Sequence, residues 1–120
     1  MRTRIRFLAL GLAVAAAGCG EVSFFDVSVS TALAVDNTVI TQCEVKVTGA
    51  ASETFSLKNC DHVTSHTIGT FEYGTDSGSG TVNFDISARD GGRNVVAHNT
   101  ISGNIAKGGH TPLMITLNPP

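Results

Sequence analysis

Residues 80–92 read Gly-Thr-Val-Asn-Phe-Asp-Ile-Ser-Ala-Arg-Asp-Gly-Gly, a strand pattern followed by a turn. The apolar residues of this stretch recur at every second position, at Val82, Phe84, Ile86 and Ala88. A period of two is typical of a strand that buries one face, and an Asp-Gly-Gly turn favours a hairpin. The stretch therefore predicts a strand with one apolar and one polar face, after which the chain turns back.

The same alternation extends outward from this stretch in both directions. Strands are predicted at residues 25–29, 39–47, 55–57, 68–73, 82–88, 94–106 and 113–117. Short strands at such spacing indicate an all-β fold, an antiparallel β-sandwich of about seven strands. A small closed β-barrel is the alternative. Gly103 falls inside one of these strands and suggests a bulge or a break there.

Length and composition limit what the chain can be. Its 120 residues leave room for one domain, and the 13 glycines and 15% charged residues favour strands and turns. The length excludes a multidomain enzyme, and no nucleophile, base and orienting group come together in the sequence. We therefore expect a protein that is not an enzyme and has no cofactor.

The N-terminal residues 1–18 differ in character from the rest of the chain. Three arginines, Arg2, Arg4 and Arg6, precede an apolar run over residues 7–17. A basic start, a short apolar run and small residues before a cleavage point are typical of a secretory signal. The run is too short to span a bilayer, which takes about 20 residues. We predict that residues 1–18 form a signal helix that is removed, and a buried N-terminal helix is the alternative.

The end of this segment resembles a known processing site. Ala16, Ala17, Gly18 and Cys19 resemble a bacterial lipobox, although the family favours Leu where this sequence has Ala16. The resemblance implies a lipid on Cys19, a short tether over residues 19–21 and a folded domain over residues 22–120. It implies a bacterial cell envelope protein held in a membrane by its lipid. Because Gly20 rather than Asp follows the cysteine, we expect the outer rather than the inner membrane.

Removal of residues 1–18 changes the charge balance. The mature chain keeps five basic residues, Lys46, Lys58, Arg89, Arg93 and Lys107, against ten acidic ones, a net charge of −5. Such a surface repels phosphate backbones, and nucleic-acid binding needs a basic stripe. The charge therefore excludes a nucleic-acid partner.

Lipid on Cys19 would leave Cys43 and Cys60 as an even pair in an oxidising compartment, where disulfides form. We predict a disulfide between them, and two buried free thiols or a metal site are the alternatives. If the two lay opposite each other on paired strands, Val45 would face Lys58, which mixes apolar and polar residues on one face. We therefore expect Cys60 in a loop rather than in a strand.

The mature chain resembles small bacterial envelope lipoproteins with one immunoglobulin-like or fibronectin-type-III-like sandwich. The resemblance rests on the lipobox, the number of strands and residues 80–92, and it departs from antibody domains in having no tryptophan. It implies a non-enzymatic interaction or structural module with an envelope protein as its partner. The alternative is a ligand-binding or hydrolase-inhibiting lipoprotein, for which Ser77 and Ser79 lie in a suitable loop.

Other polar residues offer little chemistry. Asp76-Ser77-Gly78 matches a fragment found around protease nucleophiles, but a loop rich in turn formers explains it. Asp90 is expected to accept hydrogen bonds within its own turn. If a metal binds at all, the sequence favours Asp61, His62 and His66, although solvated loop histidines are the expectation. His98 and His110 could contribute only if the fold brings them together.

Phe24 and Phe25 are adjacent, so in a strand they point to opposite faces. One of them must therefore lie outside the core. Because both follow Cys19 closely, we expect Phe24 to contact the membrane surface or a partner.

Overall fold

The computed structural model describes residues 3–7, 12–14, 22–58, 60 and 65–120, and in these parts the chain consists of strands, turns and loops. The strands are β1 (Thr3–Phe7), β2 (Leu12–Val14), β3 (Ser23–Thr31), β4 (Gln42–Gly49), β5 (Glu53–Ser56), β6 (Thr67–Thr75), β7 (Thr81–Arg89), β8 (Val95–Asn104) and β9 (His110–Leu117). A short 3-10 turn, η1 (Asn37–Val39), lies between β3 and β4.

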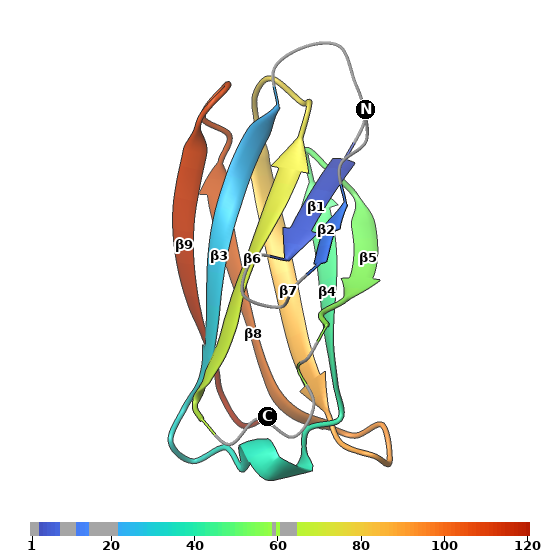
Figure 1. Ribbon diagram of the computed structural model, residues 1–120. Helices are drawn as coiled ribbons and strands as arrows, with labels where there is room; N and C mark the ends of the chain where they lie inside the picture. The colour runs from blue at the N-terminus through green and yellow to red at the C-terminus, as the bar shows by residue number, and fades with distance from the viewer. Residues whose placement is uncertain (1–2, 8–11, 15–21, 59, 61–64) are drawn as a thin grey trace.

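These strands form two sheets packed face to face (Figure 1). Sheet A has the order β2-β1-β6-β3-β9, and sheet B has the order β5-β4-β7-β8. The seven segments predicted as strands correspond to β3 to β9, so the all-β prediction is confirmed. The alternative of a small closed barrel is wrong, because the strands divide into two separate sheets.

The core lies between the sheets because each strand buries every second residue. In β3, Phe25, Val27 and Val29 are at most 1% exposed, while the residues between them reach the outer face. Phe84 of β7 projects from sheet B into the aromatic residues of sheet A. Its ring centroid lies 5.5 Å from that of Phe25 and 5.5 Å from that of Tyr73, both in edge-to-face geometry.

The described part of residues 1–18 departs from the predicted signal helix. Residues 3–7 and 12–14 are strands, and β1 pairs with β6 from Thr3 opposite Thr75 to Arg6 opposite Glu72. An edge strand exposes a row of backbone N–H and C=O groups that need partners. Here β1 meets that need along the side of β6 that faces away from β3.

The structure shows why glycine is required at two positions. Gly49 ends β4 with φ of 93°, and a Cβ there would lie 2.4 Å from the Thr81 carbonyl oxygen. Gly103 causes no bulge, because β8 continues through it and pairs it with Val82. A Cβ at Gly103 would instead lie 2.9 Å from Cε1 of Phe25, so this glycine makes room for a core ring. The bulges lie at Val29/Ser30 and at Ala88/Arg89.

The order of the strands distinguishes this sandwich from an antibody constant domain. Counted from β3 as the first strand, the seven strands are ordered 4-1-7 and 3-2-5-6 in the two sheets. A constant domain has the orders 1-2-5-4 and 3-6-7. The difference arises because two hairpins, β4–β5 and β7–β8, each stay within sheet B.

Candidate functional site

The structure brings Cys43 and Cys60 to disulfide distance, with 6.0 Å between their Cα atoms. This separation is the usual one for a disulfide, and both residues are buried. Cys43 points inward from β4, whereas Cys60 lies beyond the end of β5. Leu57, and not Cys60, follows β5 alongside Cys43, because the Leu57 backbone N–H donates to the Cys43 carbonyl at 3.0 Å. The prediction that Cys60 lies in a loop is confirmed.

Cys19, the predicted lipidation site, and the tether over residues 19–21 lie outside the described residues. The description resumes at Val22, directly before β3. Ser23 lies beside the β8–β9 connection, since its Oγ accepts from the Gly108 N–H at 2.9 Å. β3 therefore starts at the end of the sandwich that also holds the start of β9.

The predicted metal residues are only partly described, since Asp61 and His62 lie outside the described part. Nδ1 of His66 lies 3.0 Å from Oγ1 of Thr31, and this hydroxyl donates to Oδ1 of Asn37 at 2.6 Å. A threonine hydroxyl has one hydrogen to donate. Nδ1 of His66 therefore carries the proton and donates to Thr31, which makes this nitrogen a structural hydrogen-bond donor.

The carboxylates of the acidic turn residues accept hydrogen bonds from nearby residues of their own turns. Asp90 Oδ1 accepts from the backbone N–H groups of Asn94 and Gly92, each at 2.9 Å, as predicted for a turn. The Asn94 N–H in particular holds the pKa of Asp90 below its usual range. The pKa of Asp36 is lowered in the same way by the hydroxyl and N–H of Thr38. The Ser77 hydroxyl is also used locally, donating to the Ser79 carbonyl at 3.2 Å.

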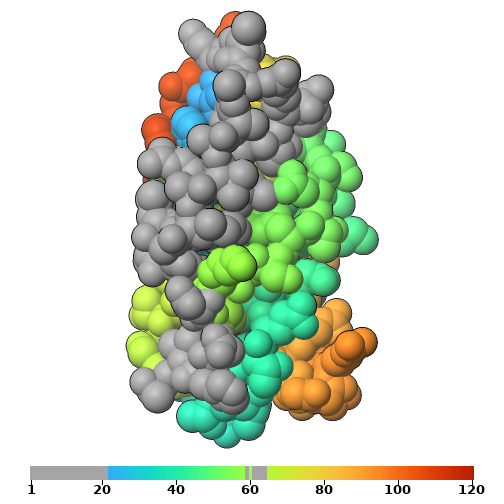
Figure 2. Space-filling model, turned by 45° about the vertical axis from the view of Figure 1, so that its right-hand side comes forward, coloured from blue at the N-terminus to red at the C-terminus, as the bar shows by residue number. Residues whose placement is uncertain are grey.

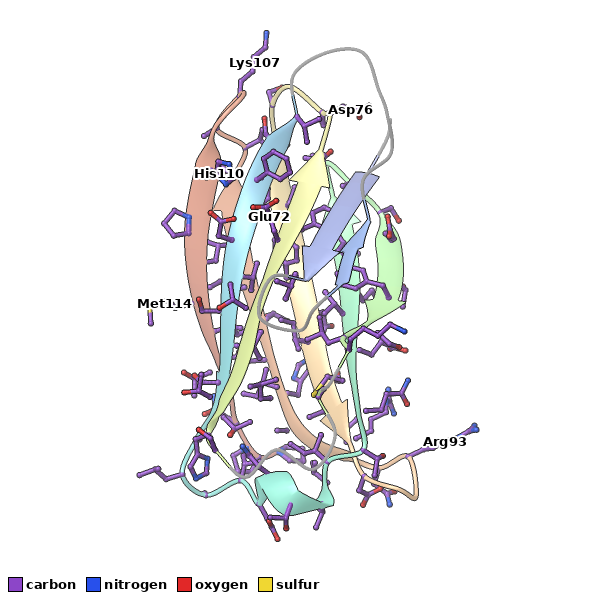
Figure 3. The ribbon with its side chains drawn as sticks, viewed as in Figure 1. Glu72, Asp76, Arg93, Lys107, His110 and Met114 are labelled. Carbon is purple, nitrogen blue, oxygen red and sulfur yellow. A yellow bond between two sulfur atoms is a disulfide. The ribbon has the colours of Figure 1, made fainter. Side chains whose placement is uncertain are left out.

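A cluster that sequence reasoning missed lies on the outer face of sheet A. Asp26 of β3, Glu72 of β6 and His110 of β9 come from three adjacent strands. Asp26 lies directly opposite Glu72, and His110 is opposite Phe24. Figure 3 shows the side chains of Glu72 and His110, on the two strands that flank β3, near the end of the sandwich where β9 begins. We call these three residues the sheet A cluster.

The sheet A cluster is compact. Nδ1 of His110 lies 3.1 Å from Oδ2 of Asp26 and 3.8 Å from Oε2 of Glu72. The ligand atoms of all three residues lie within 4.8 Å of one another. The Glu72 side chain is 6% exposed, whereas that of His110 is 52% exposed. The cluster therefore joins a buried carboxylate to a histidine that solvent can reach.

Phe24 sets the orientation of the histidine. Its ring stacks on the His110 imidazole with 4.8 Å between centroids and 17° between planes. Gly74 of β6 lies opposite Phe24, and a Cβ at Gly74 would lie 2.8 Å from Phe24 Cε1. The glycine thus leaves the space that the ring occupies. The prediction that Phe24 lies outside the core is confirmed, and its described neighbour is His110.

A second histidine and aspartate pair on sheet B offers a comparison. Nε2 of His98 lies 2.7 Å from Oδ1 of Asp85, and both side chains are about half exposed, at 44% and 47%. Among the residues that the structure describes, this pair is not joined by a third metal-ligating side chain. It is therefore a natural control for any property ascribed to the sheet A cluster.

Comparisons with known proteins do not show a family. No family model matches the chain, and no curated protein matches it. A leucine-rich repeat protein from Bacteroides thetaiotaomicron, known from a crystal structure, resembles the chain with a TM-score of 0.49 and 13% identity. The similar region covers 82% of this chain and 12% of that protein. A likeness of this size carries no inference about fold or function.

Proposed function

We propose that this chain is a lipid-anchored protein of the bacterial envelope whose sandwich binds a protein partner and performs no catalysis. The anchor would be Cys19, and the partner would bind at the opposite end of the sandwich. The resemblance to envelope lipoproteins supports the anchor. It extends to the two-sheet architecture of the domain but not to the order of its strands. The part of the chain that the structure describes contains no helix that could span a membrane.

The observation that carries the proposal is an exposed apolar end far from the anchor. β3 runs from Ser23 at one end of the molecule to Thr31 at the other, where residues 32–41 and the C-terminal end of β9 lie (Figure 1). Leu33 in this connection is 87% exposed and Val39 is 42% exposed. Since the longest dimension is 42 Å, an anchor next to Ser23 would hold these side chains well away from the bilayer.

The apolar side chains and the negative charge at this end favour a partner with apolar and basic groups. In Figure 2 the segment around residues 32–41 forms the lower end of the molecule, beside the β7–β8 loop. Grouped apolar side chains on a surface mark contact sites, whereas single ones are ordinary. Leu33 and Val39 belong to the same connection between β3 and β4. The exposed carboxylate of Asp36 lies in the same connection. Together with the net charge of −5 for residues 19–120, this favours a partner with an apolar pocket rimmed by basic groups.

The partner site is tested by cross-linking the full chain in its native envelope and identifying what is recovered with it. An antibody is used for recovery, because a tag on Pro120 would lie at the same end as Leu33. We expect Leu33→Asp to reduce the recovered partner by about tenfold or more, since a buried charge opposes an apolar contact. Met114→Asp is the matched control, because Met114 is 82% exposed on the outer face of sheet A.

Equal recovery with both variants, or equal loss, would contradict a partner site at this end. If instead the chain silences a cell-wall hydrolase and Ser77→Ala removes that effect, the inhibitor alternative replaces the proposal.

The anchor is tested separately with Cys19→Ala. We expect this variant to leave the membrane fraction and to lose the mass of the lipid, because a lipid chain contributes about 0.8 kcal/mol per buried CH₂ group. Gly20→Ala is the control, since it changes the next residue and keeps the thiol. A Cys19→Ala variant that still sediments with membranes would contradict anchoring at this residue.

A further inference from the structure

We propose that the sheet A cluster binds a divalent transition-metal cation, with zinc as the probe. The cluster offers one imidazole nitrogen, from His110, and two carboxylates, from Asp26 and Glu72. Zinc binds nitrogen and carboxylate oxygen at about 2.0–2.2 Å, so two of its ligand atoms lie roughly 3–4 Å apart. The distances from Nδ1 of His110 to the two carboxylates, 3.1 Å and 3.8 Å, are already in that range.

The charge of the cluster favours a cation. Asp26 and Glu72 are directly opposite each other on adjacent antiparallel strands, an arrangement in which like charges are destabilising. The Glu72 side chain is 6% exposed, so water screens its charge poorly. A cation bound between the two carboxylates relieves this repulsion.

The ligands are held in place before a metal arrives. They stand on three hydrogen-bonded strands of one sheet, and rigid elements position ligands better than loops do. The stacked ring of Phe24, in the space left by Gly74, fixes the plane of the His110 imidazole. Only small rotations of the two carboxylates are then needed to bring all three ligand atoms to one ion.

The ligand set also indicates which cations fit. A mixed set of imidazole and carboxylate suits zinc and similar transition metals, whereas calcium needs six to eight oxygen ligands. Three protein ligands leave a coordination position open for water or for a group from another molecule. The proposal does not depend on lipid at Cys19 or on a partner near Leu33.

The test is a zinc titration of the full chain after treatment with a chelator, followed by calorimetry and by the melting temperature. We expect one equivalent of zinc to bind and to raise the melting temperature, because a ligand that binds only the folded state stabilises it. His110→Ala and Glu72→Gln should each weaken binding by about tenfold or more. His98→Ala is the matched control, since it removes a histidine of the same aspartate-paired kind and should leave binding unchanged.

Retention of zinc binding by His110→Ala, or its loss in His98→Ala, would overturn the proposal. Loss only in a His62→Ala, His66→Ala double variant would place the site at the residues that the sequence favours instead. No heat and no change in melting at a large molar excess of zinc would also overturn it. If His110→Ala does not fold, cobalt bound to the wild-type chain gives a second measurement, since its absorption must show a nitrogen ligand and must change in Asp26→Asn.

Discussion

Replacement of Phe84 by alanine is expected to lower the free energy of unfolding by about 3–5 kcal/mol, from lost burial and from the cavity that remains. Phe84 is 0% exposed and meets three aromatic rings of sheet A, with centroids 5.5 Å from Phe25, 5.5 Å from Tyr73 and 6.1 Å from Phe71. A domain of this size has a stability of about 5–15 kcal/mol, so the loss is a large fraction of the total.

Urea unfolding followed by circular dichroism measures this change. We expect the midpoint to fall steeply for Phe84→Ala, while Met114→Ala, on the exposed outer face of β9, stays within about 0.5 kcal/mol of wild type. The loss is large because Phe84 is fully buried and contacts three aromatic rings of sheet A, whereas Phe55, the other sheet B ring at this interface, contacts two of them. A loss below about 1 kcal/mol would contradict this account of the core.

The second large effect is expected from removal of the Cys43–Cys60 pair. A disulfide that closes a loop with a sequence separation of 17 residues restricts the unfolded chain, which is worth about 3 kcal/mol on the chain-entropy model. We therefore expect the double variant Cys43→Ala, Cys60→Ala to lose about that amount of stability. Alanine is chosen because both positions are buried, where a serine hydroxyl would need a partner.

The chain has three cysteines, so this experiment is best made in a Cys19→Ala background, where only Cys43 and Cys60 remain. A reducing agent should lower the stability of that background to that of the double variant and should leave the double variant unchanged. Thiol titration of the unfolded, unreduced protein supplies the decisive control. Two titratable thiols per chain would show that the disulfide does not form.

The candidate sites differ in how far the sequence could reveal them. Cys43 and Cys60 were predictable as a pair once Cys19 was assigned to the lipid, because a count of the remaining cysteines needs no knowledge of the fold. Asp90 was also predictable, because a turn residue interacts with its neighbours in the chain. The prediction of a metal site at Asp61, His62 and His66 rested on closeness in sequence. The structure uses Nδ1 of His66 for Thr31, and the other two lie outside the described residues.

The sheet A cluster could not be predicted, although each of its residues has a plain signal of its own. Asp26 occupies an outward position of an alternating strand, and His110 follows a Gly-Gly turn. Their meeting depends on the parallel pairing of β3 with β9 and the antiparallel pairing of β3 with β6. Alternation indicates which face a residue occupies, but it does not specify which strand lies beside it.

Local sequence patterns were enough to predict the seven strands from β3 to β9, the buried face of each and the turns between them. These follow from local chemistry, since side chains alternate across a strand and glycine permits the tight turn at Gly49. The strand order, the pairing of β1 with β6 and the sheet A cluster became visible only in the folded chain. These features depend on contacts between residues far apart in the chain. Any strand can form backbone hydrogen bonds with the edge of any other strand, so hydrogen bonding alone does not choose the partner. Packing of the whole core selects the arrangement.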